Sequence, residues 1–111
     1  MRFWFFFWLC RQSDCGAVKE AWLTHHFVNS GAEAAAAALN WGHTDIDCGD
    51  QYSGGTQFND GGSIQKALDQ NLTTIQNVEA SLSRRFSALI KLGLLDPPEA
   101  QPYNKIPASA M

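Results

Sequence analysis

The sequence is poor in cysteine and in clustered positive charge, and it has no long hydrophobic run. Its three cysteines are too few for a disulfide-built scaffold and lack the paired spacing of a zinc site. A net charge of −3 with eight Lys and Arg residues argues against a nucleic-acid-binding surface. The apolar start is far shorter than the ~20 residues that span a bilayer. We therefore expect no nucleic-acid partner, no metal, no cofactor and no membrane span.

What is present fits one modest globular unit of 111 residues, with 45% hydrophobic residues and a mean hydropathy of −0.22. The aromatic segment 1–12 stands apart from the rest. It has a short apolar run after one cation but no small-residue cleavage site before Arg11, so a clear signal peptide is lacking. We expect residues 1–12 to be unrelated to the unit that follows.

The middle of the chain has an α/β pattern. Ser30 and Glu33 form a capping box ahead of an alanine-rich helix that ends near Asn40. A short expected strand over 43–49 follows, and then a glycine-rich loop. Asp14-Cys15 and Asp47-Cys48 occupy equivalent positions, each before a glycine at an expected strand end. Parallel strands bring such ends to one edge of a sheet.

The second half is expected to be helical. A short helix is predicted over 63–70, and Thr73 with Gln76 indicates a capping box for a longer helix that ends at Gly93. Apolar residues recur along this helix at spacings of three and four, which predicts a stripe packed in the core. The stripe consists of Ile75, Val78, Leu82, Phe86 and Leu89. Beyond it, the prolines predict an extended exit.

Two interpretations of Asp14 follow from the residues alone. Ser13 or Asp14 could cap a helix through 17–22, and such caps are common. Alternatively, Asp14 is a nucleophile at a strand end. His25, His26, Asp45 and Asp47 match no known metal-ligand spacing. We expect the two aspartates to accept backbone N–H groups instead.

Three motifs, taken together and in order, resemble glycoside hydrolase family 3, in particular its fungal and plant β-xylosidases. They are "SDCGAV" from Ser13, "EAAAAALNWGHTDIDCG" from Glu33, and "SLSRRFSALIKLGLLDPPEAQPY" from Ser81. The resemblance covers roughly 13–107. It departs from the family at Arg11 and Gln12, where the family has an apolar strand.

The resemblance implies an α/β fold: the C-terminal fragment of a (β/α)₈ TIM-like barrel, mostly helical, with one or two short parallel strands. Residues 13–95 would be the partial barrel domain, and 96–111 a proline-rich linker towards a second domain. A complete barrel takes ~250 residues, so we expect the chain alone to fold poorly and to be inactive.

The activity implied is that of a retaining exo-glycosidase that removes terminal β-D-xylosyl residues from xylo-oligosaccharides in xylan breakdown. Asp14 falls on the catalytic nucleophile, and the acid/base residue would come from the second domain. The enzymes it resembles are secreted, whereas the localisation of this chain is left open. A family 3 β-glucosidase is the alternative, although Cys15 favours the xylosidase. A small helical interaction protein is the alternative from another class.

Further roles follow from this resemblance and from local motifs. In a secreted enzyme, Cys15 and Cys48 are expected to form a disulfide, the other possibility being two buried thiols. Tyr52 is the best candidate for stacking on sugar, and Trp22 and Trp41 are expected to pack against helices. Asn71 begins an N-glycosylation sequon, Asn-Leu-Thr.

Overall fold

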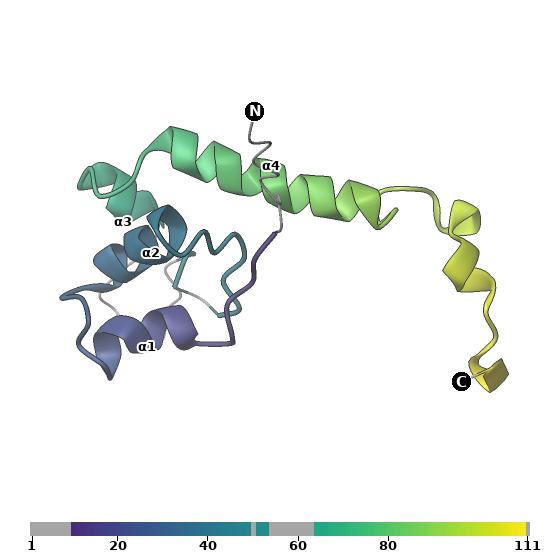
Figure 1. The fold of residues 1–111 in the computed structure, drawn as a ribbon, viewed down its shortest axis with the longest axis horizontal. Helices are drawn as coiled ribbons and strands as arrows, with labels where there is room; N and C mark the ends of the chain where they lie inside the picture. Colours follow the sequence, from purple (N-terminus) through teal and green to yellow (C-terminus); the bar gives the residue numbers. More distant parts are fainter. Residues whose placement is uncertain (1–9, 50, 54–63, 111) are drawn as a thin grey trace, which may run out of the picture.

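The structure is a computed structural model that describes residues 10–49, 51–53 and 64–110. Most of segment 1–12 and of the glycine-rich loop therefore lie outside the described residues. Four α-helices are present in the described part, in the order α1 (Ala17–Leu23), α2 (Gly31–Asn40), α3 (Ile64–Asp69) and α4 (Ile75–Lys91). Figure 1 shows α1, α2 and α3 grouped together, with α4 passing along this group and extending beyond it. The predicted mostly helical architecture is confirmed.

Helix α2 lies at the centre of the group and contacts α1, α3 and α4. Ser30 caps it by accepting the N–H of Glu33 at 3.2 Å, as the sequence predicted. The Glu33 carboxylate reaches back one residue further than a capping box requires, to the N–H of Asn29 at 2.9 Å. The helix buries alanines and one leucine, and these short side chains let three neighbouring helices approach closely. The buried set is Ala32, Ala34, Ala35, Ala36 and Leu39.

The expected short parallel strands are reduced, in the described residues, to one isolated parallel bridge between Gln12 and Ile46. Backbone hydrogen bonds extend the pairing on either side: the Arg11 carbonyl accepts from Asp45 and Ile46, and Ser13 donates to the Ile46 carbonyl. Arg11 and Gln12 are thus part of the folded unit. Whether segment 1–12 is related to the family stays a prediction.

Helix α4 begins one residue later than predicted, because Thr74 and not Thr73 is its cap. The Thr74 hydroxyl accepts the N–H of Asn77 at 3.3 Å. The Thr73 hydroxyl is directed instead to the end of α2, where it donates to Asn40 Oδ1 at 2.6 Å. A tertiary hydrogen bond therefore takes the first hydroxyl, and the cap moves to the next residue.

The prediction that the apolar stripe of α4 packs in the core is wrong for the described residues. Leu82 and Phe86 are 44% and 50% exposed, and the buried residue of this helix is Ser81. The face turned to the rest of the chain carries Asn77, Ser81 and Arg84, at positions i, i+4 and i+7. Helical periodicity located an apolar face correctly, but a polar face makes the tertiary contacts.

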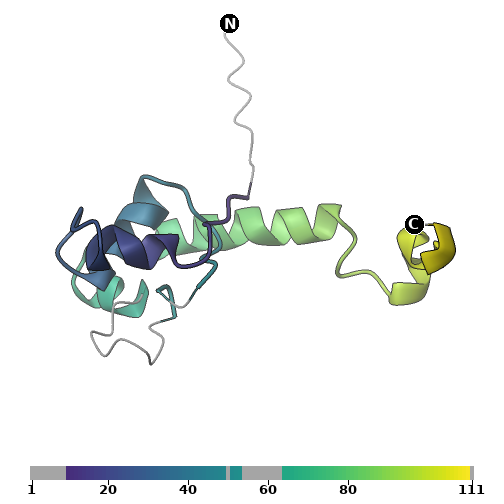
Figure 2. The same cartoon turned by 90° about the horizontal axis from the view of Figure 1, so that it is seen from below.

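The end of α4 is as predicted. Gly93 has a φ of +69°, its N–H bonds to the Ile90 carbonyl at 2.9 Å, and the next N–H, of Leu94, bonds to Leu89 at 3.0 Å. These two bonds are a Schellman motif, which requires a left-handed residue at this position. The expected extended exit is instead folded into three short 3₁₀ turns, η1 (Pro98–Ala100), η2 (Pro102–Lys105) and η3 (Ala108–Ala110). They lead away from the helical group (Figures 1 and 2). The division at residue 96 stays a prediction.

The packing of α2 makes a testable prediction. Ala35 is fully buried, whereas Ala37 lines an apolar groove of about 500 Å³ between α1 and α2. Ala35→Leu forces a larger side chain into a close helix contact and should cost about 1–3 kcal/mol of unfolding free energy. Ala37→Leu, the matched control on the same helix, should cost less because the groove has room. Urea titration followed by circular dichroism compares the two, and equal losses would contradict this account of α2.

Candidate active site

The candidate active site is formed where the Gln12–Ile46 bridge ends. Gly16 donates its N–H to the Cys48 carbonyl at 2.7 Å, and Ser13 donates to Ile46 at 2.9 Å. These bonds hold residues 13–16 alongside 46–48. The Asp14-Cys15 and Asp47-Cys48 pairs therefore lie next to each other, as expected from their equivalent positions in the sequence.

Asp14 begins a tight turn. Its carbonyl accepts the N–H of Ala17 at 3.0 Å, and Gly16, with φ 83° and ψ −10°, occupies the third position. This is the geometry of a type II turn, which needs a residue with positive φ there. Gly16 is also the cap of α1, and this position makes no side-chain cap hydrogen bond. The interpretation of Ser13 or Asp14 as a helix cap is therefore wrong.

The Asp14 side chain is exposed, and its Oδ1 accepts the N–H of Cys15 at 2.8 Å. A carboxylate with one oxygen fixed by the backbone and with access to solvent is oriented without being buried. This arrangement suits a group that must meet a ligand from outside the chain.

Ser13 and Asp47 connect the two segments behind Asp14. The Ser13 hydroxyl accepts the N–H of Cys48 at 2.8 Å and donates to Asp47 Oδ1 at 3.3 Å. The other carboxylate oxygen, Asp47 Oδ2, accepts the N–H of Tyr52 at 3.1 Å. The residue before Asp14 is thereby tied to the opposite segment by its side chain as well as its backbone.

Cys15 and Cys48 form a disulfide with their Cα atoms 4.2 Å apart, and it closes a loop with a sequence separation of 33 residues. Cys10 is a free thiol. Burial, and after it the negative charge of Asp45, raises the pKa of the Cys10 thiol, so this residue stays protonated at neutral pH. The covalent link therefore lies within the 13–16 and 46–48 pairing.

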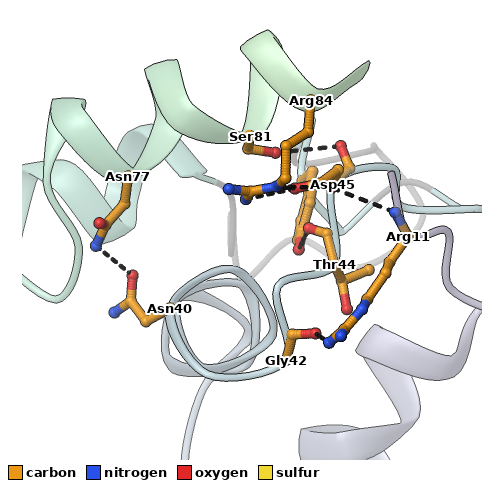
Figure 3. Close-up of polar contacts among 9 residues, drawn as sticks. Arg11, Asn40, Gly42, Thr44, Asp45, Asn77, Ser81 and Arg84 are labelled. Atoms are coloured by element: carbon orange, nitrogen blue, oxygen red, sulfur yellow. Dashed lines mark hydrogen bonds and ion pairs between the residues drawn. The ribbon is translucent and has the colours of Figure 1, made fainter. Parts of the chain in front are cut away.

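Asp45, two residues before Asp47, forms a buried ion pair with Arg84. Its side chain is fully buried and accepts Nε and Nη2 of Arg84 at 2.7–3.0 Å, while the Arg84 side chain is 17% exposed. Asp45 Oδ2 also accepts the N–H of Arg11 at 3.2 Å, and Ser81 donates to the Asp45 carbonyl at 3.5 Å. Figure 3 shows these partners converging on Asp45 from two segments, α4 and the stretch around Arg11. Both Asp45 and Asp47 accept backbone N–H groups, as expected.

The ionisation of Asp45 is set by two opposing effects. Burial by itself raises the pKa of this carboxyl group, because it removes the charge from water. The hydrogen bonds from Arg84 and from the Arg11 amide outweigh burial and hold the pKa of Asp45 below its ordinary value. The aspartate is therefore charged in the folded chain at neutral pH.

The aromatic residues predicted to stack on sugar or to pack against helices differ in their contacts and exposure. The Tyr52 hydroxyl donates to the Thr44 carbonyl at 2.8 Å, and burial, followed by the charges of Asp47 and Asp45, raises the pKa of Tyr52 far above its usual range. Trp22, a half-buried residue of α1, donates its Nε1–H to Gln51 Oε1 at 2.9 Å, and its packing against helices stays a prediction. Trp41 is 77% exposed at the edge of the groove, so its predicted packing against helices is wrong.

Sequence reasoning missed Arg84 and Arg11. Arg84 is followed directly by Arg85, and no sequence pattern assigns either arginine a role, whereas Arg11 lies where the sequence departs from the family. The available signal was the spacing of Asn77, Ser81 and Arg84 on one face of an otherwise apolar helix. Such a polar row predicts a polar contact, but not its partner.

Three further predictions concern glycosylation, metal binding and membrane spans. Asn71 is exposed in the junction between α3 and α4. Within residues 10–49, 51–53 and 64–110, no three His, Cys, Asp or Glu side chains converge as a metal site would need. No helix in these ranges is long and apolar enough to cross a membrane.

The curated relatives and the solved structure that match this chain are all exo-β-xylosidases. No family model matches the sequence. The "probable exo-1,4-beta-xylosidase" of Aspergillus clavatus is 43% identical over 94 residues, which are 85% of this chain and 11% of that protein. The exo-1,4-β-xylosidase of Emericella nidulans is 41% identical over 93 residues, 84% of this chain and 11% of that protein. A solved family 3 exo-β-xylosidase, in complex with a xylobiose aziridine activity-based probe, superimposes with a TM-score of 0.69 at 32% identity. The superposition covers 86% of this chain and 11% of the solved one.

The matched stretch of the chain therefore belongs to glycoside hydrolase family 3. Within that family, the relatives it matches are exo-β-xylosidases. The chain spans about a tenth of their length.

The Asp45–Arg84 pair predicts an acid-sensitive fold. Because the folded pKa of Asp45 is depressed, its contribution is complete above the unfolded value of about 3.9 and is lost as the pH falls through the folded pKa. Asp45→Asn leaves Arg84 without a counter-charge and should lower the unfolding free energy at pH 7 by about 3 kcal/mol. It should also flatten the acid limb. Glu79→Gln, which removes an exposed carboxylate of α4, is the control. Urea titrations at several pH values test this, and an unchanged acid limb in Asp45→Asn would refute it.

The disulfide makes a separate prediction. Oxidised, denatured protein should expose one reactive thiol, Cys10, and three after reduction. Replacing Cys15 and Cys48 by alanine should lower the unfolding free energy by up to about 3.8 kcal/mol on the chain-entropy model. Thiol titration settles the pairing, and three free thiols before reduction would exclude it.

Proposed function

We propose that this chain is the nucleophile-bearing segment of a retaining exo-β-xylosidase that removes terminal β-D-xylosyl residues from xylo-oligosaccharides. The match to a family 3 exo-β-xylosidase with a bound xylobiose probe carries the proposal. It is supported by the exposed carboxylate of Asp14, held at the end of the Gln12–Ile46 bridge.

In the proposed reaction Asp14 attacks the anomeric carbon of the terminal sugar, and the aglycone leaves. The resulting covalent glycosyl-enzyme is then hydrolysed by water, which returns the carboxylate. The acid/base residue that protonates the leaving group would stand about 5 Å from Asp14 and belongs to a part of the family fold beyond this chain.

Three contacts would orient Asp14 for this attack. The Cys15 N–H donates to one oxygen of the Asp14 carboxylate. On one side of Asp14 the Ser13 hydroxyl bonds to Asp47, and on the other side Cys15 is linked to Cys48 by the disulfide. A nucleophile fixed in this way loses little freedom when substrate binds, which lowers the barrier to attack. We further infer that Tyr52 lies close enough to this edge to contact sugar with its ring.

We also infer that the bridge marks the ends of two adjacent parallel strands of a barrel, joined by α2. The open groove beside α2 and the exposed stripe of α4 are then the surfaces that other parts of the barrel would cover. On this proposal the chain alone does not hydrolyse xylosides. Cys15, at a position where many family 3 β-glucosidases have tryptophan, favours xylosides over glucosides. The disulfide supports an oxidising, extracellular location for the enzyme.

The proposal is tested by replacing the matching segment of the Emericella nidulans enzyme with residues 13–95 of this chain. We expect the chimaera to hydrolyse an aryl β-xyloside in preference to an aryl β-glucoside. A xylobiose aziridine should label the peptide that contains Asp14, as read by mass spectrometry. Asp14→Asn should abolish labelling and lower kcat by roughly 10⁴-fold or more, the scale for loss of a covalent nucleophile.

Asp47→Asn is the matched control, because it removes a neighbouring carboxylate that is assigned to positioning. It should slow labelling without moving the label. A label on any carboxylate other than Asp14 would contradict the assignment. Hydrolysis by the purified 111-residue chain would contradict its dependence on the rest of the fold.

A further inference from the structure

Asn71, Leu72 and Thr73 form the only Asn-X-Ser/Thr sequon in the sequence. It occupies the junction between α3 and α4. Its two essential residues have opposite environments, because Asn71 is exposed whereas Thr73 is only 6% exposed.

The backbone at Asn71 suits an exposed attachment point. Asn71 has a φ of 57°, its N–H bonds to the Leu68 carbonyl at 3.0 Å, and the N–H of Leu72 bonds to Ala67 at 2.8 Å. These bonds form a Schellman motif that ends α3, with Asn71 as the left-handed residue. Neither bond involves the Asn71 side chain, so a large group on the Asn71 amide would break neither of them.

The hydroxyl of Thr73, by contrast, is committed to the fold. It donates to Asn40 Oδ1 at 2.6 Å. Asn40 also accepts Nδ2 of Asn77 at 3.0 Å, a contact visible in Figure 3, and donates to the Leu72 carbonyl at 2.9 Å. The sequon requires a hydroxyl at this position, so the modifying enzyme must contact a group that Asn40 encloses in the folded chain.

We propose that Asn71 carries an N-linked glycan and that the glycan is added before the α3–α4 junction docks on Asn40. Folding then closes the sequon, so the order of the two events decides whether the site is occupied. The Cys15–Cys48 disulfide points to the same oxidising lumen in which such transfer takes place.

The transfer is a substitution at the anomeric carbon of a lipid-diphosphate-linked oligosaccharide. The Asn71 amide nitrogen forms a bond to that carbon, the bond from the carbon to the phosphate oxygen breaks, and the lipid diphosphate leaves with the electron pair. The amide nitrogen loses one proton. No oxidant or reductant is needed.

A purely structural role for Asn71 is the rival explanation, because asparagine tolerates the left-handed turn better than most residues. Asn71→Gly separates the two roles: glycine keeps the turn and removes the acceptor nitrogen. Thr73→Ser keeps the sequon, and Asn77→Gln alters a neighbouring asparagine outside it.

The first test is to secrete the full chain from yeast behind a cleavable leader and to measure its mass before and after peptide-N-glycosidase F. The wild type, Thr73→Ser and Asn77→Gln should each lose one glycan on digestion, and Asn71→Gly should show no change. Secreted wild-type chain without a glycan would overturn the proposal.

The second test concerns the order of events. Purified oligosaccharyltransferase with a lipid-linked oligosaccharide is offered the folded, oxidised chain and the reduced, unfolded chain. The unfolded chain should be modified faster by roughly tenfold or more, the ratio expected when a hydrogen-bonded, buried hydroxyl must first be freed. Asn40→Ala should raise the rate for the folded chain, whereas Gln65→Ala, on the exposed face of α3, should not. Equal rates for folded and unfolded wild type would refute the proposed order.

Discussion

The buried ion pair between Asp45 and Arg84 is the contact on which the arrangement of the described residues depends. It joins α4 to the segment that ends at the candidate active site, and the Arg11 amide brings a third segment to the same carboxylate. A buried charge without its partner destabilises the fold strongly. Separating the three segments would break this ion pair, so the pair holds them together. The edge that carries Asp14 rests on this contact, since Asp45 and Ile46 supply the partners of residues 11–13.

Polar contacts attach α4 to the rest of the described residues, and the apolar core is small. The buried hydrophobic residues in the described part are mainly alanines of α2, which bring helices close but bury little area each. The radius of gyration of 17.3 Å exceeds the roughly 13 Å of a compact domain of this length, since α4 and the 3₁₀ turns extend away from the group. Two contacts then hold α4 in place: Asn40, at the end of α2, bonds to Asn77, and Asp45 pairs with Arg84.

The family motifs predicted which residues lie next to Asp14 better than they predicted the hydrogen bonds around it. The adjacency of the two Asp-Cys pairs followed from their equivalent positions before glycines. The sequence did not predict that Asp14 is not a helix cap. The type II turn places Gly16 at the cap position of α1, two residues after Asp14. Likewise, the capping box at Thr73 was a sound local pattern that lost its hydroxyl to Asn40. Local rules failed where a residue distant in the sequence competed for the same group.

The helices α2 to α4, the left-handed glycine that ends α4, and the family could be predicted from the sequence, because they depend on neighbouring residues and on ordered motifs. The contacting face of α4, the pairing of Arg84 with Asp45, and the burial of Thr73 beside an exposed Asn71 became evident only in the folded chain. Periodicity specifies which side chains share a face, but a contact also depends on the surface opposite, and that surface comes from segments more than thirty residues away.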